Sequence, residues 1–156
     1  MNLINGRHKD SIPLRPVENK SLLKWLKTQP SRTIQWVSST GFNAKNSEFC
    51  LIPDEGGNLH EVLVGGSDNL WDWASLPNNL PAHTYHLIGD WNCAQSNKIA
   101  LGWALGGYRY DRFKQVRKTK NPLLIWPQTC DRASVQSAVT ATFLVRDLIN
   151  TPASHM

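Results

Sequence analysis

The pattern of apolar and polar positions in the first third of the chain predicts few regular elements. Residues 1–16 are polar and interrupted by two prolines, which predicts an extended or irregular segment. Residues 19–28 carry leucines at helical spacing and are followed by Pro30, so we expect a short helix there. Residues 33–37 (TIQWV) are rich in β-branched and aromatic side chains and predict a strand.

The middle of the chain predicts a hairpin followed by a short helix. Two apolar runs, 48–52 and 59–64, flank the turn-forming segment PDEGGN at 53–58. Such a connector favours antiparallel pairing of the two strands. Residues 68–75 then place three apolar side chains on one side of one or two helical turns.

The last 73 residues alternate between strands and helices. We expect strands at 84–88 and 123–126, a helix at 94–108 between them, and a final helix over 131–149 capped by Asp131. A strand–helix–strand unit calls for a crossover and parallel pairing. Together with the hairpin, this order predicts a single α/β domain whose mixed, mostly parallel sheet is sandwiched by helices.

Three glycines in the helix predicted at 94–108 need a reason, because each costs about 1 kcal/mol against alanine inside a helix. Gly102, Gly106 and Gly107 indicate either close approach of a neighbouring backbone or an early helix end near Gly106. We favour close packing.

The final helix carries more apolar surface than one core requires. A helix that serves a single core needs an apolar stripe of about 100°. The apolar positions of its main stripe and of the extension toward its carboxyl end are Val135, Val139, Leu144, Val145, Leu148 and Ile149. We therefore expect residues 144–149 to remain exposed in the isolated chain, or to pair with another surface.

Length and charge narrow the function classes. The 156 residues suit one domain, and no stretch approaches the roughly 20 apolar residues of a membrane helix. The polar start has no apolar signal-peptide core, which favours the cytoplasm and no membrane contact. The net charge of +5 resides in residues 109–120, where six basic side chains oppose Asp111.

Candidate catalytic chemistry is weak throughout the sequence. His83 and His86 are three apart and straddle the start of the strand predicted at 84–88, and residues three apart on a strand point to opposite faces, which is poor geometry for a shared metal. Three widely spaced cysteines, Cys50, Cys93 and Cys130, form no disulfide framework or zinc motif, and we expect two or three buried free thiols. We predict no catalytic, cofactor-binding or metal-binding residue.

Three segments of the chain resemble the leucyl (cytosol-type) aminopeptidase family. They are LVGGSDNLWDWASLPNNLPAHTYHL at 63–87, ALGWALGGYRYDRFK at 100–114 and RDLINTPASHM at 146–156. The last resembles the sequence that joins the two domains in that family, and it is the most specific of the three. The resemblance covers residues 63–156 clearly and the earlier residues faintly.

The resemblance implies an N-terminal, non-catalytic domain over 1–149, with 150–156 as the start of the linker to a C-terminal catalytic domain. Family members are two-metal exopeptidases that release N-terminal residues from peptides with manganese or zinc, and they assemble as hexamers. Their metal ligands lie in C-terminal motifs such as Asn-Thr-Asp-Ala-Glu-Gly-Arg, which this sequence lacks. The family's N-terminal domain is macro-domain-like, and in some bacterial members it helps to bind DNA.

Two other function classes remain open from the sequence. A macro-like fold with the basic segment 109–120 could bind nucleotide or nucleic acid, because lysine and arginine gain affinity by releasing counterions from phosphates. The plainer interpretation of that segment is a solvated loop or a contact to the missing domain. A free-standing enzyme is disfavoured, since no nucleophile–base pair or metal-ligand set can be assembled.

Overall fold

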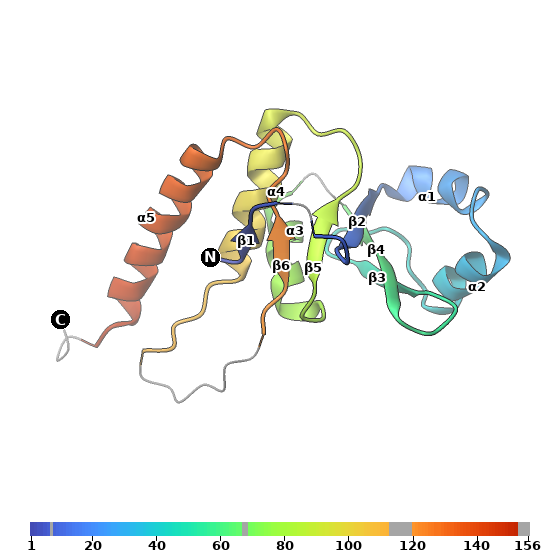
Figure 1. Ribbon diagram of the computed structural model, residues 1–156, viewed down its shortest axis with the longest axis horizontal. Coiled ribbons are helices and arrows are strands. Elements are labelled where there is room, and N and C mark those ends of the chain that lie inside the picture. Colours follow the sequence, from blue (N-terminus) through green and yellow to red (C-terminus); the bar gives the residue numbers. More distant parts are fainter. Residues whose placement is uncertain (7, 67–68, 113–119, 153–156) are drawn as a thin grey trace.

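A mixed sheet forms the centre of the molecule and separates two groups of helices (Figure 1). The computed structural model describes residues 1–6, 8–66, 69–112 and 120–152. The strands are β1 (Leu3–Ile4), β2 (Ile12–Val17), β3 (Phe49–Pro53), β4 (Leu59–Gly65), β5 (Thr84–Leu87) and β6 (Leu123–Ile125). The helices are α1 (Asn19–Leu26), α2 (Ser31–Ser39), α3 (Leu70–Asn79), α4 (Cys93–Gly106) and α5 (Arg132–Asn150).

The strand order in the sheet is β1-β6-β5-β2-β4-β3. Every neighbouring pair is parallel except β3 and β4, which form the antiparallel hairpin predicted from the sequence. The predicted crossover is also present, because β5 and β6 pair in parallel and α4 connects them. The α/β class and the mixed, mostly parallel sheet are therefore confirmed.

Each face of the sheet has its own apolar core. Val62 and Val64 of β4 belong to the cluster beneath α3, α4 and α5, whereas Leu63 belongs to the cluster beneath α1 and α2. A strand buried on both faces needs a continuous apolar run, which β4 has. The largest side chains of the first cluster, Trp73, Tyr85 and Trp103, are fully buried.

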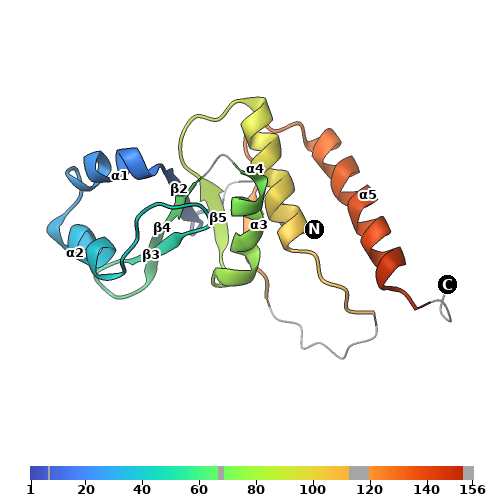
Figure 2. The same cartoon turned by 180° about the vertical axis from the view of Figure 1, so that it is seen from behind.

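The glycines of α4 let it pack directly on α3, and the two helices lie side by side in Figure 2. A Cβ on Gly102 would overlap the backbone of Leu70, and a Cβ on Gly106 would overlap the backbone of Ala74. The preference for close packing is confirmed. The helix also ends at Gly106, two residues before the predicted end.

The strand predicted at 33–37 is wrong, because these residues lie within α2. Only Val37 is buried there, while Ile34 and Trp36 are exposed by 36% and 42%. Ile34 and Val37 are three apart, which suits one helical face, and strand propensity yields readily to tertiary context. The Trp36 indole instead donates a 2.7 Å hydrogen bond to the carbonyl of Leu51 on the edge strand β3.

Residues 1–16 follow the extended alternative of the prediction, since they contain β1 and most of β2. β2 lies in the middle of the sheet although it contains Pro13 and Pro16. It pairs with β5 over residues 12–14 and with β4 over residues 14–17. Each proline therefore lies where the strand has a partner on one side only, which accommodates a residue without an N–H.

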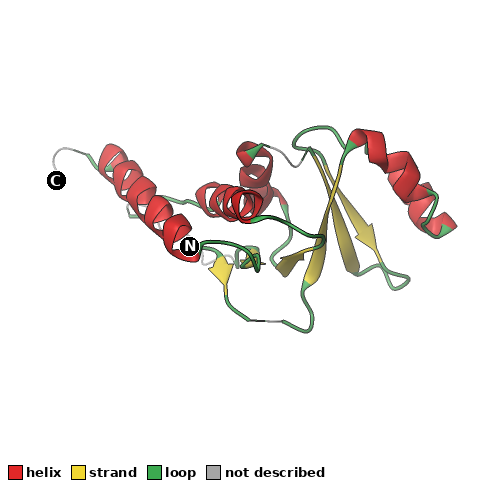
Figure 3. Cartoon of the chain, turned by 90° about the horizontal axis from the view of Figure 1, so that it is seen from above, coloured by secondary structure: helices red, strands yellow, loops and turns green. Residues whose placement is uncertain are grey.

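The helices on the two faces are well separated when the molecule is seen from above (Figure 3). α1 and α2 cover one face, while α3 and α4 cover the other and α5 packs outside α4. The predicted turns at 68–75 form the longer helix α3, which continues through Pro77 to Asn79. None of the described helices has the length and apolar character needed to cross a bilayer.

Candidate functional site

Four of the nine exposed large hydrophobic side chains among the described residues lie in the second half of α5. Val135 and Val139 are buried against the core, with 3% and 2% exposure. In the second half of the helix the apolar side chains are mostly exposed: Leu144 by 59%, Val145 by 53%, Leu148 by 51% and Ile149 by 78%. The expectation that residues 144–149 are not fully buried within one chain is confirmed. We refer to these four side chains as the α5 apolar face.

A hydrogen-bonded cluster fixes the end of α5 to the segment that follows α4. The Tyr108 hydroxyl donates a 2.7 Å hydrogen bond to Oδ1 of Asp147, and Asn150 Nδ2 donates to the Tyr108 oxygen at 3.3 Å. The Tyr108 ring also packs on Phe143, with ring centroids 5.0 Å apart. Removal from water and, next, the hydrogen bond to Asp147 raise the pKa of Tyr108.

Arg146 and Thr151 add further contacts to this cluster. Arg146 donates a 3.0 Å hydrogen bond to the carbonyl of Leu105, and its guanidinium lies 5.2 Å from the centre of the Tyr108 ring. Thr151 Oγ1 donates to the carbonyl of Asp147 at 2.6 Å and lies 2.9 Å from the hydroxyl of Tyr110. The described parts of two family-like segments, 100–114 and 146–156, thus contact each other.

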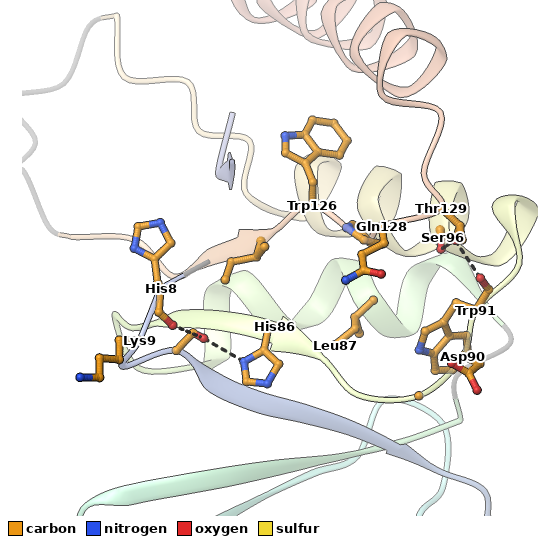
Figure 4. A pocket seen from close by; sticks show the side chains of 14 residues that line it. His8, Lys9, His86, Leu87, Asp90, Trp91, Ser96, Trp126, Gln128 and Thr129 are labelled. Atoms are coloured by element: carbon orange, nitrogen blue, oxygen red, sulfur yellow. Dashed lines mark hydrogen bonds between the residues drawn. The ribbon is translucent and has the colours of Figure 1, made fainter. Parts of the chain in front are cut away.

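A cleft of about 980 Å³ lies between the loop before β2 and the segments that follow β5 and β6 (Figure 4). His86 Nδ1 lies 3.0 Å from Ser11 Oγ, which itself donates to the carbonyl of His8. Burial lowers the pKa of His86. Ser96 Oγ is hydrogen-bonded to Thr129 Oγ1, which in turn donates to the carbonyl of Trp91. Both hydroxyl groups therefore have hydrogen-bond partners within the chain.

The structure places the two closely spaced histidines in different surroundings. His86 lines the 980 Å³ cleft, whereas His83 lines a separate depression near Lys120. Across residues 1–6, 8–66, 69–112 and 120–152, no three histidine, cysteine or acidic side chains come together as metal ligands would.

The cysteines are free thiols, as expected, but their burial differs from the prediction. Cys50 is buried, Cys130 is half-buried and Cys93, the first residue of α4, is exposed. Two or three buried thiols were expected, and only one is found, because Cys93 precedes the first inward-facing turn of α4. Burial raises the pKa of Cys50 and of Cys130, which disfavours the reactive thiolate at both positions.

Another cleft, of about 890 Å³, opens where β2 and β4 end. Asp72, a buried carboxylate that sequence reasoning missed, is one of the residues that line it. The only sequence signal was an acidic residue in the first turn of an otherwise apolar helix. Within the basic segment 109–120, residues 113–119 lie outside the described residues.

The sequence profile of the M17 aminopeptidase N-terminal domain matches residues 12–127. The chain belongs to the M17 aminopeptidase family. The matched range begins at the first residue of β2 and ends at Pro127, two residues after β6. It therefore includes every strand of the sheet except β1. The family resemblance inferred from residues 63–156 is confirmed. The profile match starts at residue 12 and so extends the resemblance into the first half of the chain.

One solved structure supports the same assignment, and two others share the fold. The cytosol aminopeptidase of Coxiella burnetii superimposes with a TM-score of 0.88 at 32% identity, covering 99% of this chain and 34% of that one. Tomato leucine aminopeptidase covers 98% of this chain and 39% of its own at a TM-score of 0.65 and 16% identity. The bottromycin maturation enzyme BotP in complex with Mn covers 92% and 32% at a TM-score of 0.62 and 20% identity.

The last two likenesses, at 16% and 20% identity, show the fold alone. The chain spans about a third of the length of these relatives. No curated protein sequence matches the chain significantly. The assignment as an M17 N-terminal domain therefore rests on the sequence profile and the Coxiella structure, and neither lends support to the macro-like nucleotide-binding alternative.

Proposed function

We propose that this chain is the non-catalytic N-terminal domain of a longer metal-dependent aminopeptidase, here called the parent. In this proposal residues 1–149 form the domain and residues 150–156 begin the linker to a C-terminal catalytic domain. The parent releases N-terminal amino acids from peptides, is cytoplasmic and assembles as a homo-hexamer. Support comes from family membership and from the Coxiella relative, a cytosol aminopeptidase about three times as long as this chain.

Metal chemistry in the parent belongs to residues outside this chain. Two divalent ions, manganese or zinc, would polarise the scissile carbonyl and activate water, as paired-metal sites do. Within the described parts of the chain no cluster of three ligand-type side chains exists to hold such an ion. The residues present therefore do not fit the metal pair, and we assign no catalytic step to them.

The α5 apolar face carries the proposal. Large apolar surfaces left open on a monomer mark interaction sites. This one lies on the last helix, and the cluster around Tyr108 and Asp147 holds the end of that helix in one direction. In this proposal the connection to the catalytic domain starts at the end of α5, on the same helix as this face.

The test has two parts. The purified chain, with Mn²⁺ or Zn²⁺ added, should not hydrolyse L-leucine 4-nitroanilide, while the parent should. Hydrogen exchange should then be slower at residues 144–149 in the parent than in the chain. Exchange around Leu23, which is 73% exposed on the opposite side of the molecule, serves as the matched control and should not change.

Metal-dependent, stoichiometric turnover by the chain itself would contradict the non-catalytic role. Equal exchange at 144–149 in chain and parent would show that the catalytic domain does not cover the α5 apolar face.

A further inference from the structure

The segment between β6 and α5 is attached to the beginning of α4 by hydrogen bonds. Thr129 Oγ1 lies 2.7 Å from Ser96 Oγ and donates to the carbonyl of Trp91 (Figure 4). Two residues further on, the amide of Asp131 donates a 2.8 Å hydrogen bond to Asn97 Oδ1. The chain is therefore held against this end of α4 on both sides of residue 130.

This attachment brings two cysteines close together. Cys130 lies between the two attached residues. Cys93 is the first residue of α4, three positions before Ser96 and four before Asn97, and residues at those spacings share one face of a helix. The face of α4 that holds the segment therefore also carries Cys93. Burial and, next, the negative charge of a Cys93 thiolate raise the pKa of Cys130, and charges affect each other in this way only at short range.

The two thiols differ in their access to solvent. Cys93 is exposed, whereas Cys130 is half-buried against the core beneath α4 and α5. An oxidant in solution therefore reaches Cys93 first and finds Cys130 beside it. An accessible cysteine next to a second, resolving cysteine is typical of redox-responsive sites. Cys50 is buried in the cluster beneath α1 and α2, on the other face of the sheet, and cannot take part.

We propose that Cys93 and Cys130 form a reversible disulfide when the chain is exposed to a peroxide. The Cys93 thiolate attacks one oxygen of hydrogen peroxide, the O–O bond breaks, and a sulfenic acid forms while hydroxide leaves and takes up the Cys93 proton. The Cys130 sulfur then attacks the Cys93 sulfur, the S–S bond forms, and the sulfenic oxygen leaves as water with the Cys130 proton. Two thiols are oxidised, and one peroxide is reduced to two water molecules. A thiol reductant reverses the change by exchange.

The disulfide joins the start of α4 to the start of α5. α5 begins at Arg132, two residues after Cys130, and residues 126–129 line the cleft that contains His86. Oxidation therefore fixes both the first turn of the last helix and one wall of that cleft. The proposal does not depend on the aminopeptidase assignment, because it rests on contacts within this chain alone.

The test treats the purified, reduced chain with a small excess of hydrogen peroxide, unfolds it, blocks the remaining thiols with iodoacetamide and measures the intact mass. One blocked thiol should remain in place of the three free cysteines, and dithiothreitol should restore all three. The Tm of the oxidised chain should rise by at least about 5 °C, because a cross-link restricts the unfolded chain.

Matched variants identify the pair. Cys50→Ser removes the buried thiol on the other face and should still form the disulfide. Cys93→Ser and Cys130→Ser should each form no disulfide within the chain, and neither should show the rise in Tm. Cys93→Ser changes an exposed side chain, so it keeps the test valid if Cys130→Ser fails to fold.

Several outcomes would overturn the proposal. Oxidation of Cys93 alone to a sulfinic acid, with Cys130 still open to blocking, would mean that the two sulfurs do not meet. A disulfide between two chains on a non-reducing gel would mean that Cys93 reacts with a second copy instead. Three unchanged thiols after peroxide treatment, or a disulfide that includes Cys50, would contradict it equally.

Discussion

Replacing Gly106 with alanine tests whether backbone contact between α3 and α4 governs stability. On helix propensity alone the change should stabilise the protein by about 1 kcal/mol. A Cβ at this position, however, would overlap the carbonyl group and Cα of Ala74, and backbone atoms cannot rotate aside as a long side chain can. Overpacking a tight contact costs about 1–3 kcal/mol, and the rigid neighbour places this case at the upper end.

The expected net result for Gly106→Ala is therefore a loss of about 2 kcal/mol in the free energy of unfolding. For a domain of this size that corresponds to a fall in Tm of roughly 4–8 °C. Urea unfolding followed by tryptophan fluorescence measures it, because Trp73 and Trp103 are fully buried in the same core.

Two controls separate packing from propensity. Ala94→Gly reverses the chemical change at an exposed position of the same helix and should lose no more than about 1 kcal/mol. Adding Ala74→Gly to Gly106→Ala should not restore stability, since the overlap involves the backbone of Ala74 and not its methyl group. A Gly106→Ala protein as stable as the original would refute the close-packing argument.

Three further predictions concern capping, pH and charge. Asp131→Ala removes the side-chain acceptor for the Ser134 amide, 3.1 Å away, and should lower the free energy of unfolding by about 1 kcal/mol in urea titrations; no change would mean that the cap is dispensable. Because burial lowers the pKa of His86, its contribution to stability is present above the ordinary histidine pKa and is lost as pH falls through the lowered value. Tm should accordingly drop between about pH 7 and pH 5, and less so in His86→Asn; identical pH profiles would exclude this cause. Binding of DNA through 109–120 should be weak, similar for two unrelated duplexes and strongly reduced by salt, and tight binding to one duplex at high salt would contradict this.

Local patterns in the sequence were sufficient for the hairpin and for the second half of the fold. The hairpin around 53–58 follows from a turn-forming connector between two apolar runs. The parallel pairing of β5 and β6 follows from the helix between them, because a crossover leaves few alternatives. Asp131 was recognisable as a cap since its role depends only on the residues that immediately follow it.

Other features depended on contacts between distant segments. Pro13 and Pro16 argue against a central strand, yet β2 is central because β5 and β4 pair with different halves of it. Residues 33–37 have strand propensity, but their single buried position, Val37, and the contact of Trp36 with β3 favour a helix.

The apolar width of the last helix could be predicted from the sequence, since helical spacing alone defines a face. That Asp72 is buried with one free oxygen could not, because its surroundings come from the 44–47 loop and the end of β4, which only the folded sheet brings together. The spacing of apolar residues thus determined which side of a helix or strand is apolar, and the tertiary structure decided which polar groups are buried away from water.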